Sequence, residues 1–69
     1  MLKNLIRVLE DKNITRKTFA EYLGISERTL QNKVKETTAF TYPEVKKTCT
    51  LFSEYNSDFL FKSFNEKAG

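Results

Sequence analysis

A polar helix face near the middle of the chain carries side chains that could read base edges or grip phosphate. Its members are Glu27, Arg28, Asn32 and Lys33. An arginine can form a bidentate pair of hydrogen bonds with guanine, and an asparagine amide can pair with adenine. A glutamate can accept a hydrogen bond from the amino group of cytosine. Glu27 has a second interpretation, because a carboxylate in the first turn of a helix also interacts favourably with the helix dipole. The residue types point to a nucleic-acid partner.

Basic and polar residues around this face are candidates for phosphate contacts. Arg16 and Lys17 open the preceding helix, where their charge and unpaired backbone N–H groups can both meet phosphate. Gln31 lies at the outer start of the later helix. Lys33 and Lys35 follow it, and we expect both to contact phosphate rather than bases.

Two short amphipathic helices must position these side chains, the first capped by Thr15 and the second by Ser26. Gly24 suits the left-handed end of the first helix, so the turn to Ser26 is tight. Leu30 and Val34, four residues apart, place an apolar stripe opposite the polar face. The layout predicts a helix-turn-helix. The Ser26 hydroxyl is expected to act mainly as a cap, and it could also contact phosphate.

Three further helices are expected, and no stretch alternates with the period of a strand. Apolar positions 2, 5, 6 and 9 predict a first helix that ends near position 12, with Asn13 as its exit. Thr41 and Glu44 form a capping-box pattern that opens a fourth helix. We expect that helix to bury Val45, Cys49 and Phe52, with Thr48 and Leu51 at its margins. Ser57 is expected to cap a short fifth helix.

Length and composition limit the class of protein. A chain of 69 residues is expected to form one domain over residues 1–64, followed by a disordered tail at 65–69. No apolar run approaches the roughly 20 residues that cross a bilayer, and no signal peptide is visible. The chain has no histidine and only Cys49, which argues against a zinc site, a histidine-based dyad or a disulfide. We expect a cytoplasmic protein that is not an enzyme and uses no cofactor, membrane or small-molecule ligand.

The positive charge is concentrated in the first part of the chain. Residues 1–42 hold eight Lys or Arg against five Asp or Glu, whereas residues 43–69 hold four of each. The first part therefore carries the whole net charge of +3. A basic half is the expected footprint of a polyanionic partner, although many small domains are equally basic.

Several short segments together carry a family resemblance. In the helix-turn-helix they are Phe19-Ala20, Leu23-Gly24-Ile25-Ser26, Thr29-Leu30 and Asn32-Lys33-Val34. In the later helices they are Tyr42-Pro43-Glu44-Val45, Leu51-Phe52 and Asp58-Phe59-Leu60-Phe61. With these residues the chain resembles the Cro- and repressor-type (XRE-like) helix-turn-helix family of bacteriophage transcriptional regulators. The resemblance covers nearly the whole chain and implies an all-α, five-helix, lambda-repressor-like DNA-binding domain.

The resemblance also implies a dimer on a pseudo-palindromic operator, with the third helix of each subunit in the major groove. By position, the base-reading residues would be Glu27, Arg28, Thr29 and Asn32. Residues lining the DNA backbone after the recognition helix would be Lys33, Lys35, Thr37 and Thr38. Arg16 stands where the family commonly has a phosphate-contacting glutamine. Two features depart from the family: Glu36-Thr37 replaces a frequent Asn-Gly, and the acidic Glu27 is unusual at a base-facing position.

The end of the chain is rich in aromatic residues, more than one short helix can bury. They are Tyr55, Phe59, Phe61 and Phe64. One interpretation is a partner surface, used by a homodimer or by a larger repressor protein. The other is a core short of volume that aromatic side chains fill.

Two functions from different classes remain open. The leading hypothesis is a small phage Cro-like repressor that acts in the bacterial host by occupying operator DNA and blocking polymerase. The rival is an antirepressor of the same fold that binds a cognate repressor protein. Nonspecific nucleic-acid binding is a third option, for which a net charge of +3 is modest. Substituting Arg28 and Asn32 together would separate the first two.

Overall fold

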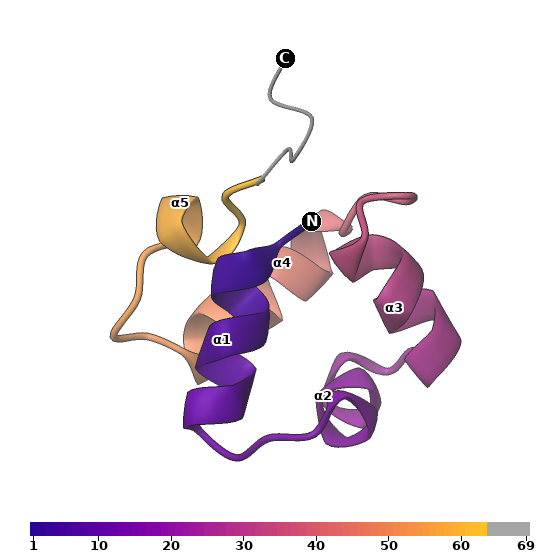
Figure 1. Ribbon diagram of the computed structural model, residues 1–69, viewed down its shortest axis with the longest axis horizontal. Coiled ribbons are helices and arrows are strands. Elements are labelled where there is room, and N and C mark those ends of the chain that lie inside the picture. Colours follow the sequence, from indigo (N-terminus) through magenta and orange to yellow (C-terminus); the bar gives the residue numbers. More distant parts are fainter. Residues whose placement is uncertain (64–69) are drawn as a thin grey trace.

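Five helices follow one another in the computed structural model, which describes residues 1–63 (Figure 1). They are α1 (Lys3–Asp11), α2 (Arg16–Leu23), α3 (Glu27–Val34), α4 (Tyr42–Leu51) and α5 (Ser57–Leu60). No strand occurs among the described residues. The expected all-α, five-helix architecture is therefore confirmed. The expected tail at 65–69 lies outside the described residues.

Four of the five helices begin at a side-chain cap. The hydroxyl of Thr15 accepts from the backbone N–H of Thr18, and that of Ser26 accepts from the N–H of Thr29, each over 3.1 Å. Thr41 forms the expected capping box with the fourth helix's first turn. The cap of α5 was wrongly expected at Ser57. It is the preceding residue, Asn56, whose side chain accepts from the N–H three residues ahead over 2.8 Å.

The turn between α2 and α3 depends on Gly24. Its φ of +79° lies in the left-handed region, and the N–H of Ile25 donates to the carbonyl of Ala20 over 3.0 Å. Only Ile25 separates Gly24 from the cap of α3. The helix end, the turn and the next helix start are therefore held by consecutive residues, as the sequence predicts.

Replacing Gly24 with alanine is expected to lower the free energy of unfolding by about 1–2 kcal/mol, the cost of a left-handed backbone at a residue with a Cβ. An added Cβ would meet nothing within 4 Å, so backbone strain is the sole source of the loss. Urea unfolding measures the effect. Gly24→Asn is the matched control and should lose less, because asparagine adopts this conformation more readily. An alanine variant as stable as the wild type would contradict the prediction.

The core lies where the helices meet, and its buried apolar side chains come from α1, α2, α3, α5 and the end of α4. They are Leu2, Leu5, Val8, Leu9, Phe19, Ala20, Leu23, Leu30, Val34, Phe52 and Leu60. The rings of Phe19 and Phe52 lie 6.0 Å apart at its centre. This set confirms the apolar faces that the helical spacing predicts for α2 and α3.

The buried face of α4 differs from the expectation. Thr48 is fully buried, whereas Val45 and Cys49 are half-buried and Leu51 is 38% exposed. The Thr48 hydroxyl donates to the carbonyl of Glu44 over 2.8 Å, so its polar group is satisfied within the helix. Its methyl group can then face the core without leaving an unpaired donor.

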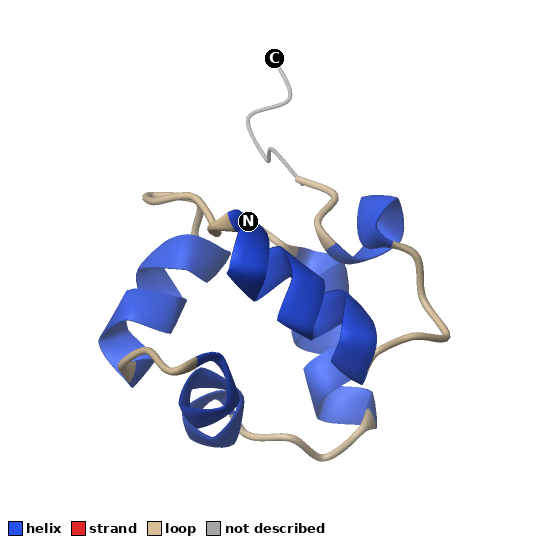
Figure 2. Cartoon of the chain, turned by 180° about the vertical axis from the view of Figure 1, so that it is seen from behind, coloured by secondary structure: helices blue, strands red, loops and turns tan. Residues whose placement is uncertain are grey.

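The packing of the helices places α3 and α5 far from each other. α2 packs against both α3 and α4, and α1 packs against α5. Figures 1 and 2 both show α3 and α5 on opposite sides of the molecule, with α1 between them. The N–H of Leu2 donates to the carbonyl of Val34 over 3.0 Å and ties the start of the chain to the end of α3. None of the helices in residues 1–63 has the length and apolar character needed to cross a bilayer.

Candidate nucleic-acid interface

The outer face of α3 carries polar side chains at helical spacing. Arg28, Asn32 and Lys35 follow one another at intervals of four and three residues, which places them on one side of the helix. Arg28 and Lys35 are exposed and Asn32 is half-buried. Leu30 and Val34 are fully buried on the opposite side. The helix is therefore fixed by one face and presents hydrogen-bonding groups on the other.

The first turn of α3 combines capping with exposed polarity. Ser26 donates its hydroxyl to the hydroxyl oxygen of Thr29 over 2.8 Å, in addition to accepting the N–H of that residue. Glu27 is exposed in this first turn, where it also complements the helix dipole. Thr29 is half-buried on the flank of the outer face. Both interpretations of Glu27, as a base reader and as a dipole partner, are compatible with this position.

The N-terminus of α2 lies beside one flank of α3, next to its outer face. The Nη1 of Arg16 donates to the Oε1 of Gln31 over 2.7 Å, and this contact is partly buried. Lys17 is exposed next to Arg16. Two residues far apart in the sequence, both expected near phosphate, therefore form one cluster across the two helices.

Lys33 does not lie where the sequence interpretation placed it. Its side chain is buried, and the ammonium lies 2.8 Å from the Oε1 of Glu44 and 3.0 Å from the carbonyl of Ala39. It also lies 5.8 Å from the centre of the Phe40 ring. The expectation that Lys33 contacts phosphate is therefore wrong, because its charge is already paired inside the protein. Its spacing from Leu30, three residues earlier on the apolar stripe, was the signal that could have found this.

Glu44 is the residue that the sequence interpretation missed as a partner for Lys33. Burial alone would raise the pKa of its carboxyl group, but hydrogen bonds from the Lys33 ammonium and the Thr41 N–H outweigh burial and hold the pKa below the ordinary value of 4.5. The Oε1 atom accepts from Thr41 over 2.9 Å as well as from Lys33. One carboxylate thus connects the end of α3 to the capping box of α4.

Stability is expected to fall as the pH drops from about 5 to about 3, because the unfolded chain takes up a proton on Glu44 before the folded chain does. A folded-state pKa below 4.5 contributes stability above that pH and loses it as the pH falls through the lowered pKa. Urea unfolding of the wild type and of the Lys33→Met/Glu44→Gln double variant across this range measures the contribution, because Glu44→Gln alone would leave the buried Lys33 ammonium without a partner. Equal pH dependence in the two proteins would contradict it.

The segment after α3 turns through a left-handed residue, Glu36, at φ +66°. Asparagine and glycine adopt this conformation more readily than glutamate. The Glu36 carboxylate accepts from the N-terminal ammonium of Met1 over 2.7 Å and from the hydroxyl of Ser63 over 2.6 Å. The first of these hydrogen bonds is the main reason that the pKa of Glu36 lies below its ordinary value. Thr37 and Thr38 are exposed beyond this anchored residue, at the C-terminal end of α3.

The aromatic residues near the end of the chain divide into two ring pairs, and both Tyr55 and Phe61 pack partly against the core. The rings of Tyr55 and Phe59 stack 5.5 Å apart, and Phe59 is 41% exposed. Phe61 instead packs edge-on against Phe40 at 5.1 Å, because residues two apart on a helical turn point to different sides. Tyr55 and Phe61 therefore fit the core-filling interpretation, while the exposed Phe59 stays a candidate for a partner surface. The fourth residue, Phe64, lies outside the described residues.

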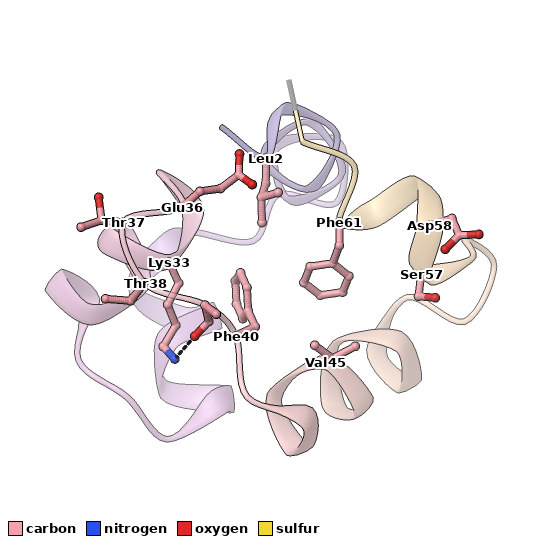
Figure 3. Close-up of a pocket in the computed structure, with 11 residues that line it drawn as sticks. Leu2, Lys33, Glu36, Thr37, Thr38, Phe40, Val45, Ser57, Asp58 and Phe61 are labelled. Atoms are coloured by element: carbon pink, nitrogen blue, oxygen red, sulfur yellow. Dashed lines mark hydrogen bonds between the residues drawn. The ribbon is translucent and has the colours of Figure 1, made fainter. Parts of the chain in front are cut away.

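Phe61 and Phe40 line an open groove of about 750 Å³. Figure 3 shows the two rings next to one another in its lining, with Leu2 and Val45 nearby. Its polar rim includes Asp58 and the segment that follows α3. This groove could not be predicted from the sequence, because its walls come from segments far apart in the chain.

No cluster of His, Cys, Asp and Glu side chains within residues 1–63 could hold a metal ion. Every buried side-chain nitrogen or oxygen of the described residues has a hydrogen-bond partner.

Comparison with known proteins identifies one family. A family model described as a Cro/C1-type HTH DNA-binding domain matches residues 4–60. The match contains the whole of α2, the turn and α3, together with the segment that follows. A search of curated proteins and a search of solved structures found no match.

Proposed function

Because the chain belongs to the Cro/C1-type helix-turn-helix DNA-binding family, we propose that it is a sequence-specific transcriptional regulator that occupies operator DNA through α3. The single observation that carries the proposal is the two-sided character of this helix. Leu30 and Val34 are fully buried, while Arg28 and Lys35 are exposed on the opposite side. A helix fixed in this way can enter a major groove without rearranging the fold.

Each part of the helix-turn-helix has a distinct role in this proposal. Base edges are read by Glu27, Arg28, Thr29 and Asn32. Phosphates are contacted by Arg16, Lys17, Ser26, Gln31, Lys35, Thr37 and Thr38. Lys33 is left out of the interface because its ammonium is paired with Glu44. The short turn at Gly24 holds the two helices at one angle, so phosphate contacts by α2 set the register of α3.

In biological terms, we propose a Cro-like repressor of bacteriophage origin that acts as a homodimer in the cytoplasm of the bacterial host. It would block polymerase by occupying the promoter, and its own concentration would set the degree of repression. The exposed Phe59, stacked on Tyr55, supports a partner surface on the side of the molecule away from α3. A dimer formed there would leave both recognition helices accessible.

The groove beside Phe40 and Phe61 favours a second candidate function, an antirepressor that binds a cognate repressor protein. A groove of this size, with two aromatic rings in its lining and polar residues at its rim, is able to receive side chains of a partner protein. In that case the exposed residues of α3 would not be needed for regulation. The two functions therefore differ in what a change at Arg28 and Asn32 does.

Selection from a randomised duplex library tests the DNA-binding proposal. We expect an enriched palindrome with half-sites about one helical turn apart, bound by a dimer. Binding of the enriched site should weaken steeply with salt. Arg16, Lys17 and Lys35 in each subunit make six cations per dimer, which corresponds to a slope of about −5 in log affinity against log salt. No enrichment, with only weak salt-sensitive binding, would overturn the specific-regulator proposal.

A further inference from the structure

The hydrogen bond between Arg16 and Gln31 restricts how the glutamine can act. A guanidinium group has only donors, so the contact requires Gln31 to turn its Oε1 toward Arg16. The amide NH2 group of Gln31 must then point away from Arg16. Gln31 therefore offers a donor, and Arg16 keeps further N–H groups beyond the one it uses.

The position of the pair indicates which part of DNA it meets. Gln31 lies one turn after Glu27, on the flank of α3 that faces α2, whereas Arg28 and Asn32 occupy the outer face. The flank nearest the N-terminus of α2 is the side on which the proposed phosphate contacts lie. A cluster that presents only donors is complementary to a phosphate oxygen, which only accepts.

We propose that Arg16 is a positioning residue for Gln31, and that the two side chains bind one phosphate of the operator backbone as a single unit. The inference rests on the proposed function and goes beyond it. Arg16 and Gln31 would not be two independent contacts, because Arg16 fixes the orientation in which the Gln31 amide can donate. Removing the Arg16 side chain should therefore remove most of the contribution that Gln31 makes to the affinity for operator DNA.

A double-mutant cycle on operator binding tests this coupling. We expect Gln31→Ala to weaken binding about fivefold per subunit in the wild type, as one hydrogen bond is lost in each subunit, and less than twofold per subunit in Arg16→Ala. Arg7→Ala, an exposed arginine of α1, is the matched control for loss of charge and should leave the effect of Gln31→Ala unchanged. An equal fold-change for Gln31→Ala with and without Arg16 would overturn the proposal.

The Gln31→Glu variant separates the hydrogen bond that residue 31 accepts from Arg16 from the hydrogen bond that it donates to phosphate. A carboxylate still accepts from Arg16 but has no donor for phosphate, so this variant should fold normally and bind DNA more weakly than Gln31→Ala. Thermal unfolding checks the fold. A methylphosphonate placed at the contacted phosphate should abolish the difference between wild type and Gln31→Ala. If Gln31→Ala instead relaxes the preference at one base position, the phosphate assignment is wrong.

The hydrogen bond between Arg16 and Gln31 can be tested without DNA. In the protein without DNA, the side-chain amide resonances of Gln31 should change on Arg16→Ala and stay unchanged on Arg7→Ala. Unchanged Gln31 resonances on Arg16→Ala would show that Arg16 does not orient the Gln31 amide, even if the protein binds the operator. Absence of operator binding by the wild type would overturn the proposed function and, with it, the phosphate assignment.

Discussion

Replacing Lys33 with methionine is expected to lower the free energy of unfolding by about 3–5 kcal/mol, because it leaves the buried Glu44 carboxylate without its partner. A domain of this size is stable by only about 5 kcal/mol, so much of the variant should be unfolded at room temperature. Urea unfolding or the thermal midpoint measures the loss. Lys35→Met, an exposed lysine two residues later, is the matched control and should change stability by less than about 0.5 kcal/mol.

A second substitution shows whether the loss comes from unpaired charge. Combining Lys33→Met with Glu44→Gln removes the uncompensated carboxylate and keeps an amide oxygen that can still accept from Thr41. We expect the double variant to recover most of the stability, since a neutral pair avoids burying an isolated charge. If the single variant is as stable as the wild type, the ion pair contributes little and Lys33 could turn outward to DNA.

Arg28→Ala and Asn32→Ala are each expected to weaken binding to the selected operator, by about 1–3 kcal/mol per lost base contact. A dimer carries each change twice, so the loss per dimer should be larger than for one contact. Arg28→Lys is the informative control, because lysine keeps the charge and loses the two-pronged guanidinium. A competition assay against random duplex DNA separates lost base reading from lost charge.

The same two substitutions separate the candidate functions. If DNA is the target, the Arg28→Ala/Asn32→Ala protein should lose regulation while keeping its fold and any contact with a protein partner. If the protein is an antirepressor that acts through the groove beside Phe40 and Phe61, regulation should be unchanged. Reporter repression in cells, together with thermal unfolding of the variant, decides between the two outcomes.

The sequence predicts the helices well because their signals are local. A cap at Thr15 or Ser26 acts on an N–H three residues ahead, and the left-handed end of α2 is a property of Gly24 itself. Local signals of this kind leave an ambiguity of one residue where two capping residues are adjacent. Asn56 and Ser57 are such a pair, and the structure uses the first.

The candidate site was harder to predict where contacts cross between helices. Lys33 and Glu44 are eleven residues apart, and the capping box explains Glu44 without any partner from α3. A lysine beside an apolar stripe, such as Lys33, is predicted to be exposed unless an acidic partner inside the protein is known. Similarly, Tyr55 and Phe61 lie close in the sequence but face different neighbours. Pairing between distant segments decides these cases, and periodicity carries no information about it.

The side-chain caps at the starts of four helices have a consequence for the speed of folding. Each cap joins residues three positions apart, so each helix can find its start without waiting for distant segments to meet. Small helical domains dominated by local contacts fold in about microseconds to milliseconds. A newly made chain should therefore fold within a small fraction of the seconds that its own translation takes. The delay between expression of the gene and its effect would be set by synthesis and accumulation of the protein.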